Sequence, residues 1–203
     1  AIAHAYADFD SGRFAADLAR RIAIPTESQN PDRAGDLVAY LKNEMIPAFE
    51  AMGFATRILE HPAAKAPFLF AERIEGEGLP TVLGYGHGDV IRGLDEGWRE
   101  GLSPWRMDVV GDRWYGRGVV DNKGQHSINM AAQAAVIATR GKLGFNAKWI
   151  IEMGEETGSP GLREVIEDNK ALLAADLLIA SDGPRLSAPR PTVFLGARGA
   201  FLV

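Results

Sequence analysis

The amino-acid sequence predicts an α/β fold of three layers, in which helices cover both faces of a mostly parallel, mixed sheet. Short apolar runs with glycine or acidic residues at their ends are typical of buried strands, and such runs occupy residues 81–86, 145–153 and 176–180. A long alanine-rich segment, residues 123–140, separates the first two runs and has the composition of a helix that packs closely on a sheet. Strands that alternate with helices in this way are typical of a parallel sheet.

The composition is that of one globular domain. The chain has 203 residues, of which 46% are hydrophobic and 24% charged, enough to bury a core. A net charge of -5 offers no basic surface for nucleic acid, and without cysteine the fold has neither disulfides nor thiolate metal ligands. No apolar run reaches the roughly 20 residues of a membrane span, and residues 1–6 lack the pattern of a signal peptide. We therefore expect a cytoplasmic protein without a membrane or nucleic-acid partner.

Two helices and two strands are expected before the first glycine-bounded run. Apolar residues recur at helical spacing in both helices, with Ser11 as the N-cap of the first and Pro31 in the first turn of the second. These four elements are expected at residues 11–24, 30–49, 54–59 and 68–74. His4 and His61 are expected to be surface histidines in loops.

His87 follows the apolar run 81–86 and lies between Gly86 and Gly88. A histidine in a strand is usually a hydrogen-bonded polar group, but glycines on both sides allow another group to approach it closely. Asp89, two residues on, can lie on the same side and accept the second imidazole N–H, which fixes the tautomer for metal binding. His87 is therefore a candidate metal ligand, and Asp89 is its candidate partner.

Asp121 stands on a glycine-rich turn just before the helix at 123–140. Such an aspartate is either a turn or N-cap residue or a ligand that points into a cleft. The preceding connection, residues 97–118, carries three tryptophans and a tyrosine, which we expect to form a hydrophobic cluster over the core. His126 is five residues beyond Asp121 and need not face the same way on a helix, so we expect it to be structural.

Two further strands end in acidic residues. Glu155 and Glu156 follow the run 145–153, and Asp182 follows the run 176–180. Adjacent carboxylates after a strand are usually loop charges that face solvent, so the pair Glu155 and Glu156 is ambiguous by itself. The other elements expected in this part are a helix at 159–173, a loop at 184–191 and a strand at 192–195.

The strand ends are expected to meet, because ligands of an open α/β sheet bind at the carboxyl ends of its strands. Carboxylates brought together without a cation repel one another, and burial raises their pKa values. A bound metal ion relieves both effects. Imidazole and carboxylate ligands without thiolate suit zinc, with cobalt or manganese as alternatives, and one carboxylate can bridge two ions about 3.5–4 Å apart.

Four motifs of this sequence resemble, in order and spacing, those of the M20 metallopeptidases. They are Gly-His-Gly-Asp-Val at 86–90, Gly-Arg-Gly at 116–118 with Asp-Asn-Lys-Gly at 121–124, Glu-Glu-Thr-Gly-Ser at 155–159 and Ser-Asp-Gly-Pro at 181–184. That family includes carnosinase-like dipeptidases, acetylornithine deacetylase, succinyl-diaminopimelate desuccinylase and aminoacylases. The resemblance implies a zinc-peptidase-like αβα fold that hydrolyses an amide bond of a dipeptide or an N-acyl amino acid, and the motif forms favour the dipeptidase-like branch.

The resemblance also implies a role for each candidate residue. The metal ligands that it implies are His87, Asp121, Glu156 and Asp182. The catalytic residues that it implies are Glu155, the general base, and Asp89, the partner of His87. In this arrangement Asp121 bridges two zinc ions, and the peptide bond that follows it is expected to be cis.

The family pattern continues beyond the motifs of this chain. It includes a second metal-ligating histidine, which follows a lid and dimerisation domain. By the resemblance, residues 1–196 are the N-terminal part of the catalytic domain and residues 197–203 begin the crossing to the lid. We therefore expect a homodimeric parent protein, and a weak or inactive site with its second ion absent when the 203 residues are alone.

Two other functions stay open. Clusters of His, Asp and Glu also serve two-metal phosphoesterases, although the sequence has no phosphate-binding Gly-Lys-Ser/Thr loop. A non-catalytic metal-binding or regulatory domain is the other alternative, but a domain without catalysis has no need of both Glu155 and Glu156. Hydrolysis of an amide or of a phosphate ester distinguishes the metallopeptidase from the phosphoesterase. Absence of metal uptake by the full-length protein would favour the non-catalytic domain.

Overall fold

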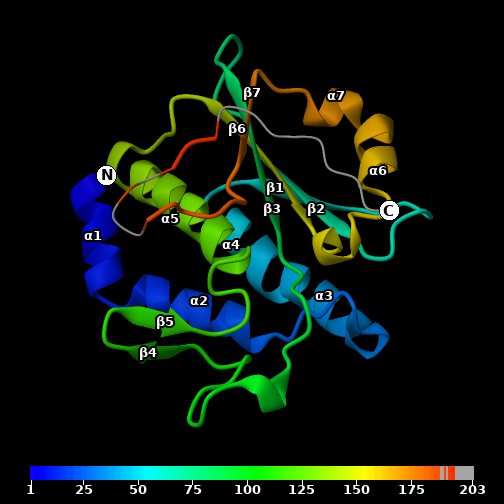
Figure 1. The fold of residues 1–203 in the computed structure, drawn as a ribbon. Coiled ribbons are helices and arrows are strands. Elements are labelled where there is room, and N and C mark those ends of the chain that lie inside the picture. Colours follow the sequence, from blue (N-terminus) through cyan, green and yellow to red (C-terminus); the bar gives the residue numbers. More distant parts are fainter. Residues whose placement is uncertain (188–189, 191, 195–203) are drawn as a thin grey trace.

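The computed structural model describes residues 1–187, 190 and 192–194, which form an α/β fold (Figure 1). Its main sheet has five strands in the order β1-β2-β6-β3-β7, and β4 and β5 form a separate hairpin. The strands are β1 (Ala55–Leu59), β2 (Phe68–Arg73), β3 (Thr81–His87), β4 (Asp108–Val110), β5 (Arg113–Tyr115), β6 (Asn146–Glu152) and β7 (Leu177–Ala180).

The main sheet is mixed, as predicted. Strands β6, β3 and β7 are parallel neighbours, whereas β2 runs antiparallel to β6 and β1 antiparallel to β2. The carboxyl ends of the three parallel strands therefore lie at one edge of the sheet. The register places His87 beside Glu152 and Tyr85 beside Ala180. His87 ends β3 at this edge, and Glu155 and Asp182 follow β6 and β7 there.

Helices lie on both faces of the sheet (Figure 1). The helices are α1 (Ile2–Asp10), α2 (Arg13–Ala23), α3 (Ala34–Tyr40), α4 (Ile46–Ala51), α5 (Lys123–Arg140), α6 (Leu162–Asp168) and α7 (Lys170–Leu173). Residues of α3, α4 and α5 pack on one face, residues of α6 and α7 pack on the other, and α1 and α2 contact α5. The three predicted layers are therefore present.

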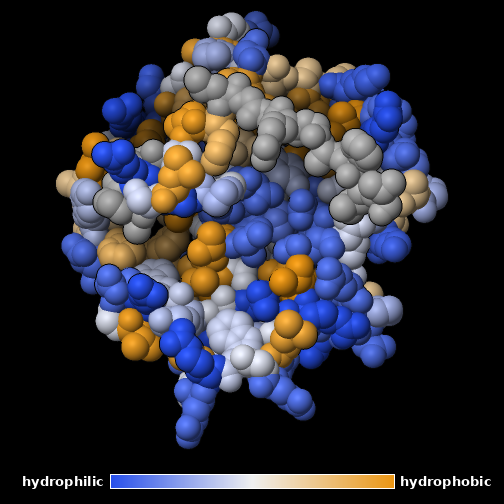
Figure 2. All heavy atoms as spheres, viewed as in Figure 1, coloured by the Kyte–Doolittle hydropathy of each residue, from blue (hydrophilic) through white to orange (hydrophobic). Residues whose placement is uncertain are grey.

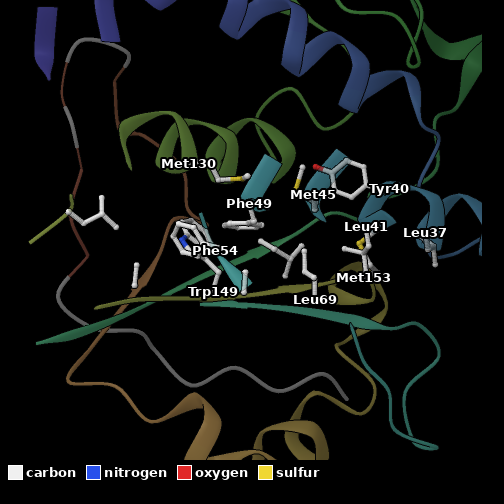
Figure 3. Close-up of a cluster of buried hydrophobic side chains, with 14 residues drawn as sticks. Leu37, Tyr40, Leu41, Met45, Phe49, Phe54, Leu69, Met130, Trp149 and Met153 are labelled. Atoms are coloured by element: carbon white, nitrogen blue, oxygen red, sulfur yellow. The ribbon is translucent and has the colours of Figure 1, made fainter. Parts of the chain in front are cut away.

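Alternation along β6 explains why this strand is central. Trp149 and Ile151 belong to the core cluster beneath α3, α4 and α5, whereas Ile150 belongs to the cluster beneath α6 and α7. In the larger cluster the Phe49 ring contacts the rings of Phe54 and Trp149, while Tyr40 lies away from them, on the side of Leu37 (Figure 3). Tyr40 belongs to this cluster, and a Cβ at Gly88 would lie 2.5 Å from its ring, so the larger core reaches the carboxyl end of β3.

Two predicted helices are interrupted. The segment predicted as one helix at 30–49 has a 3₁₀ turn at Pro31–Arg33 and a π-helical turn at Leu41–Met45 between α3 and α4. Pro47 explains the second interruption, because proline has no N–H to donate to the preceding turn. The helix predicted at 159–173 is divided into α6 and α7 at Asn169, whose side chain donates to the Val165 carbonyl at 2.8 Å.

Other predictions are wrong at the ends of the chain. His4 lies in helix α1 and not in a loop, whereas His61 does lie in a loop. The strand β7, predicted to be buried, is exposed along its length, and no strand occurs at residues 192–194. Three predictions fall partly or wholly outside the described residues. They are the last residue of the strand predicted at 192–195, part of the loop predicted at 184–191, and the domain crossing predicted at 197–203.

The connection 97–118 contains more structure than predicted, since it includes the β4–β5 hairpin. Its Trp114 ring stacks on Phe9 of α1 at 5.6 Å between centroids, so this part of the aromatic set covers the N-terminal helices. On the face drawn in Figure 2, hydrophilic side chains occupy the centre and hydrophobic side chains are scattered around them. Within the described residues, no helix has both the length and the apolar character that crossing a membrane requires.

Candidate metal centre

His87 stands at the end of β3 with its side chain fully buried, and its Nε2 atom faces acidic residues from two other segments. The distance from Nε2 is 3.1 Å to Oδ1 of Asp121 and 3.6 Å to Oδ2 of Asp182. One ligand atom from each of these three residues lies within 4.8 Å of the others. The fold therefore brings together residues that are far apart in the sequence. Even the nearest two, His87 and Asp121, are separated by 34 positions.

The glycines on either side of His87 make room for neighbours. A Cβ at Gly86 would lie 2.8 Å from Cβ of His126, and a Cβ at Gly88 would lie 2.5 Å from Cε1 of Tyr40. Distances this short are incompatible with packing, so larger residues would push β3 away from α3 and α5. The two glycines thus let the strand end sit directly against the helices behind it.

Asp89 fixes the orientation of the His87 ring. Its Oδ1 lies 3.3 Å from Nδ1 of His87, and its main-chain carbonyl lies 3.1 Å from the same nitrogen. Because both neighbours are acceptors, Nδ1 carries the proton when the ring is neutral, and the lone pair is then on Nε2, the atom that faces Asp121 and Asp182. The predicted partnership of Asp89 with His87 is present in the structure.

Asp121 does not cap α5. The N-cap of that helix is Asn122, and the Asp121 carboxylate instead faces Nε2 of His87. The Asp121 side chain is 65% exposed, so one side of it is open to a ligand. The peptide bond between Asp121 and Asn122 is cis, as expected. The structure therefore excludes the N-cap role and shows a turn residue whose side chain points to the cluster, while its role as a metal ligand stays a prediction.

Glu155 and Glu156 form a 3₁₀ turn directly after β6. Oε2 of Glu155 lies 3.9 Å from Nε2 of His87, so this carboxylate also borders the cluster. Glu156 lies on the same turn but is not among the residues whose ligand atoms gather around His87. Its role as a metal ligand stays a prediction.

The pKa values of the cluster show the effect of crowding acids together. Burial, reinforced by the charge of Asp121, raises the pKa of Glu156 to about 7. Burial and neighbouring carboxylates also raise the pKa values of Glu155 and Asp182. Burial would lower the pKa of His87, but Asp89 and the other carboxylates outweigh it and raise that pKa to about 9. The raised pKa values mean that positive charge, such as a proton, is favoured among these side chains.

Residues outside the predicted metal ligands and catalytic residues support the cluster through hydrogen bonds. The Asn122 side chain bonds to the His87 backbone, and His126 bonds to both Asn122 and Tyr40. His126 is buried and is not part of the cluster, which agrees with its expected structural role. The Glu152 carboxylate accepts hydrogen bonds from the hydroxyls of Tyr85 and Ser159. The only sequence signal for Asn122 is its place in the Asp-Asn-Lys-Gly motif, and the only one for Ser159 is its place in the Glu-Glu-Thr-Gly-Ser motif.

The fold and the cluster define an α/β protein whose histidine and carboxylate side chains, at the carboxyl ends of parallel strands, are of the kinds that hold metal ions. Residues 83–193 match the model of peptidase family M20/M25/M40, a span that contains every candidate site residue. The chain belongs to this family.

Similarity to individual proteins agrees with that assignment. The chain is 35% identical over 136 residues to beta-Ala-His dipeptidase of Mus musculus, a match that covers 66% of this chain and 27% of that protein. It is 37% identical over 112 residues to succinyl-diaminopimelate desuccinylase of Novosphingobium aromaticivorans, covering 54% and 28%. The crystal structure of human carnosine dipeptidase 1 superposes with a TM-score of 0.83 at 27% identity, over 91% of this chain and 41% of that one. These matches span between about a quarter and two fifths of the relatives' lengths.

Proposed function

We propose that this chain forms part of a metal-dependent hydrolase that cleaves the amide bond of a dipeptide or an N-acyl amino acid. The observation that carries the proposal is the position of His87, whose buried Nε2 faces Asp121, Asp182 and Glu155 at 3.1, 3.6 and 3.9 Å. Names of relatives support the substrate class, since they include dipeptidases and a desuccinylase. Membership of a peptidase family supports the reaction.

The residues present fit a divalent cation. One imidazole and several carboxylates, without thiolate, form a donor set that suits zinc, and cobalt or manganese can occupy the same set. The raised pKa values of Glu156 and His87 show that the cluster holds excess negative charge. We propose zinc, with His87 and Asp182 on one ion, Glu156 on a second and Asp121 shared. When bound, the cation supplies Lewis acidity that polarises a carbonyl and makes water more acidic.

Glu155 is the proposed general base. Its carboxylate borders the cluster without a hydrogen bond to it, and burial raises its pKa toward the range in which a carboxylate exchanges protons near neutral pH. Glu155 takes a proton from the attacking water while the water oxygen bonds to the amide carbon. The same proton passes to the amine as the C–N bond breaks, so the carboxylate is regenerated.

The proposal extends to the whole protein. We place residues 1–196 in a catalytic domain and residues 197–203 at the start of a crossing to a lid, through which the protein dimerises. A second histidine ligand is proposed to lie beyond residue 203. The proposed compartment is the cytoplasm, in keeping with a sequence that has no cysteine.

The test is hydrolysis by the protein after chelation and reloading with zinc, cobalt or manganese. The substrates are β-Ala-His, an N-succinyl amino acid and, for the phosphoesterase alternative, a nitrophenyl phosphodiester. We expect metal-dependent release of free amino acid, and a fall of about 10²–10⁴-fold in Glu155→Gln at unchanged metal content. Glu100→Gln, an exposed loop acid, is the matched control and should retain full activity. Full turnover in Glu155→Gln, or cleavage of the phosphodiester alone, contradicts the proposal.

A further inference from the structure

The Asn122 side chain fills a place between two strands where their own pairing stops. The ladder between β3 and β7 ends at the pair of Tyr85 and Ala180. Beyond that pair, Oδ1 of Asn122 accepts the backbone N–H of His87 at 3.2 Å, and its Nδ2 donates to the Ser181 carbonyl at 2.6 Å. The carboxamide therefore bridges the two strand ends as a peptide group would, accepting on one side and donating on the other.

The remaining hydrogen-bonding capacity of the amide is used by α5. Nδ2 also donates to Oε1 of Gln125 at 2.8 Å, and Oδ1 lies 3.1 Å from Nδ1 of His126. Because Oδ1 is only an acceptor, Nδ1 of His126 carries the proton, and Nε2 accepts the Tyr40 hydroxyl at 2.7 Å. With both donors and its acceptor engaged, Asn122 has one possible orientation. The network extends from the strand ends to Tyr40 in the core.

The surroundings leave no room for an alternative placement. Asn122 and His126 are both fully buried, and a Cβ at Gly86 would lie 3.1 Å from Oδ1 of Asn122. Packing therefore holds the amide against the β3 backbone, and the hydrogen bonds set its rotation. Such double constraint by packing and hydrogen bonds is what precise placement of a site requires.

We infer that Asn122 is the positioning residue that sets the separation of His87 from Asp182. The amide bonds to the backbone of His87 itself and to Ser181, the residue directly before Asp182. The inference deepens the proposed function and rests on the proposed metal centre. The proposed role requires a carboxamide at position 122. Aspartate there would turn a carboxylate oxygen toward the Ser181 carbonyl. Leucine there would remove both hydrogen bonds at nearly the same side-chain volume.

The test compares Asn122→Leu and Asn122→Asp with wild-type protein in a cobalt titration, which gives both an affinity and an absorption spectrum that reports ligand geometry. Groups that orient metal ligands typically change metal affinity 10–100-fold, so we expect a loss of about that size and an altered cobalt spectrum in both variants. The matched control is Asn129→Leu. Asn129 lies on the same helix and donates to the Ser181 hydroxyl at 2.8 Å, but it has no bond to β3. Its cobalt affinity should stay within about threefold of wild type.

A second measurement needs no metal. In the chelated protein, hydrogen exchange of the His87 amide should be slow in wild type and at least tenfold faster in Asn122→Leu. The Gly88 amide, which bonds to the Glu152 carbonyl at 2.9 Å, serves as the internal reference. Unchanged His87 exchange, or wild-type cobalt affinity and spectrum in Asn122→Leu, overturns the inference. A wild-type protein that takes up no cobalt overturns the proposed function instead, and the exchange measurement still decides whether Asn122 holds His87.

Discussion

Asp89 Oδ1 accepts the backbone N–H of Glu155 at 3.1 Å, and the second oxygen of the same carboxylate accepts the N–H of Glu156 at 3.1 Å. The residue that orients the His87 ring thus also clamps the turn that carries both glutamates. Because Asp89 is fully buried, its charge is balanced by these donors and not by water. One carboxylate therefore fixes the ends of β3 and β6 relative to each other.

Replacing Asp89 by Asn should weaken metal binding about 10–100-fold. An amide can accept only on its oxygen, so its NH₂ group would face either a backbone N–H of the turn or the protonated Nδ1 of His87. The measurement is zinc affinity by competition with a chromophoric chelator. Asp112→Asn, in the exposed turn between β4 and β5, removes a charge without touching the site. Equal zinc affinities for the two variants would show that Asp89 does not orient the cluster.

Replacing Gly86 by Ala should destabilise the fold by about 1–3 kcal/mol, since the added Cβ would overlap His126. The matched control is Gly35→Ala in helix α3, where nothing lies within 4 Å of the new Cβ. Alanine at that helical position should stabilise by about 0.5–1 kcal/mol. The free energy of unfolding in urea measures both changes, and opposite signs are expected. A Gly86→Ala variant as stable as wild type would mean that β3 does not pack against His126 as described.

The clustering of three of the predicted site residues could be predicted because the signals are local. Apolar runs bounded by glycine mark the strand ends, and the parallel arrangement brings His87, Asp121 and Asp182 to one edge of the sheet. The supporting contacts were not predictable, because they join residues that are far apart in the sequence. Asn122 reaches Ser181 across 59 residues, and Tyr40 reaches His126 across 86.

The wrong predictions also have physical reasons. The composition of β7 is that of a buried strand, yet Leu178 is 61% exposed, because in the described part of the chain β7 has a strand neighbour on one edge only. An apolar run by itself does not report how many neighbours cover it. Helix α1 was missed because it buries no residue and so lacks the apolar stripe that marks a helix on a core.

Replacing Lys123 by Met should destabilise the fold by about 1–3 kcal/mol. The buried amino group donates to the carbonyls of Arg21 and Ile24 at 2.8 and 2.7 Å, at the C-terminal end of α2. Methionine fills similar space but leaves both buried carbonyls without their donor. The unfolding free energy at pH 7 measures the loss, with the exposed Lys142→Met as control. Equal stability of the two variants would mean that the carbonyls find other donors.

The buried His126 should make stability depend on pH below about 6.5. Burial lowers its pKa well below the ordinary value, and the charges of Arg21, His87 and Lys123 lower it further. Between pH 6.5 and its folded pKa, the ring is protonated in the unfolded chain and neutral in the folded one, so acid favours unfolding by up to about 1.4 kcal/mol per pH unit. The stabilisation due to neutral His126 is thus present above pH 6.5 and is lost as the pH falls.

The His126→Gln variant isolates this effect, because glutamine can bond to Tyr40 and Asn122 without titrating. We expect wild type to lose stability relative to the variant when urea unfolding is compared at pH 7.5, 6.5 and 5.5 in the presence of a chelator. His61→Gln, in the loop between β1 and β2, should follow wild type at each pH. A difference between wild type and His126→Gln that stays constant from pH 7.5 to 5.5 would mean that His126 takes up a proton in the folded protein. A doubly protonated ring would still donate from Nδ1 to Asn122, but it could no longer accept the Tyr40 hydroxyl, so the link from Asn122 to the core would be broken at Tyr40.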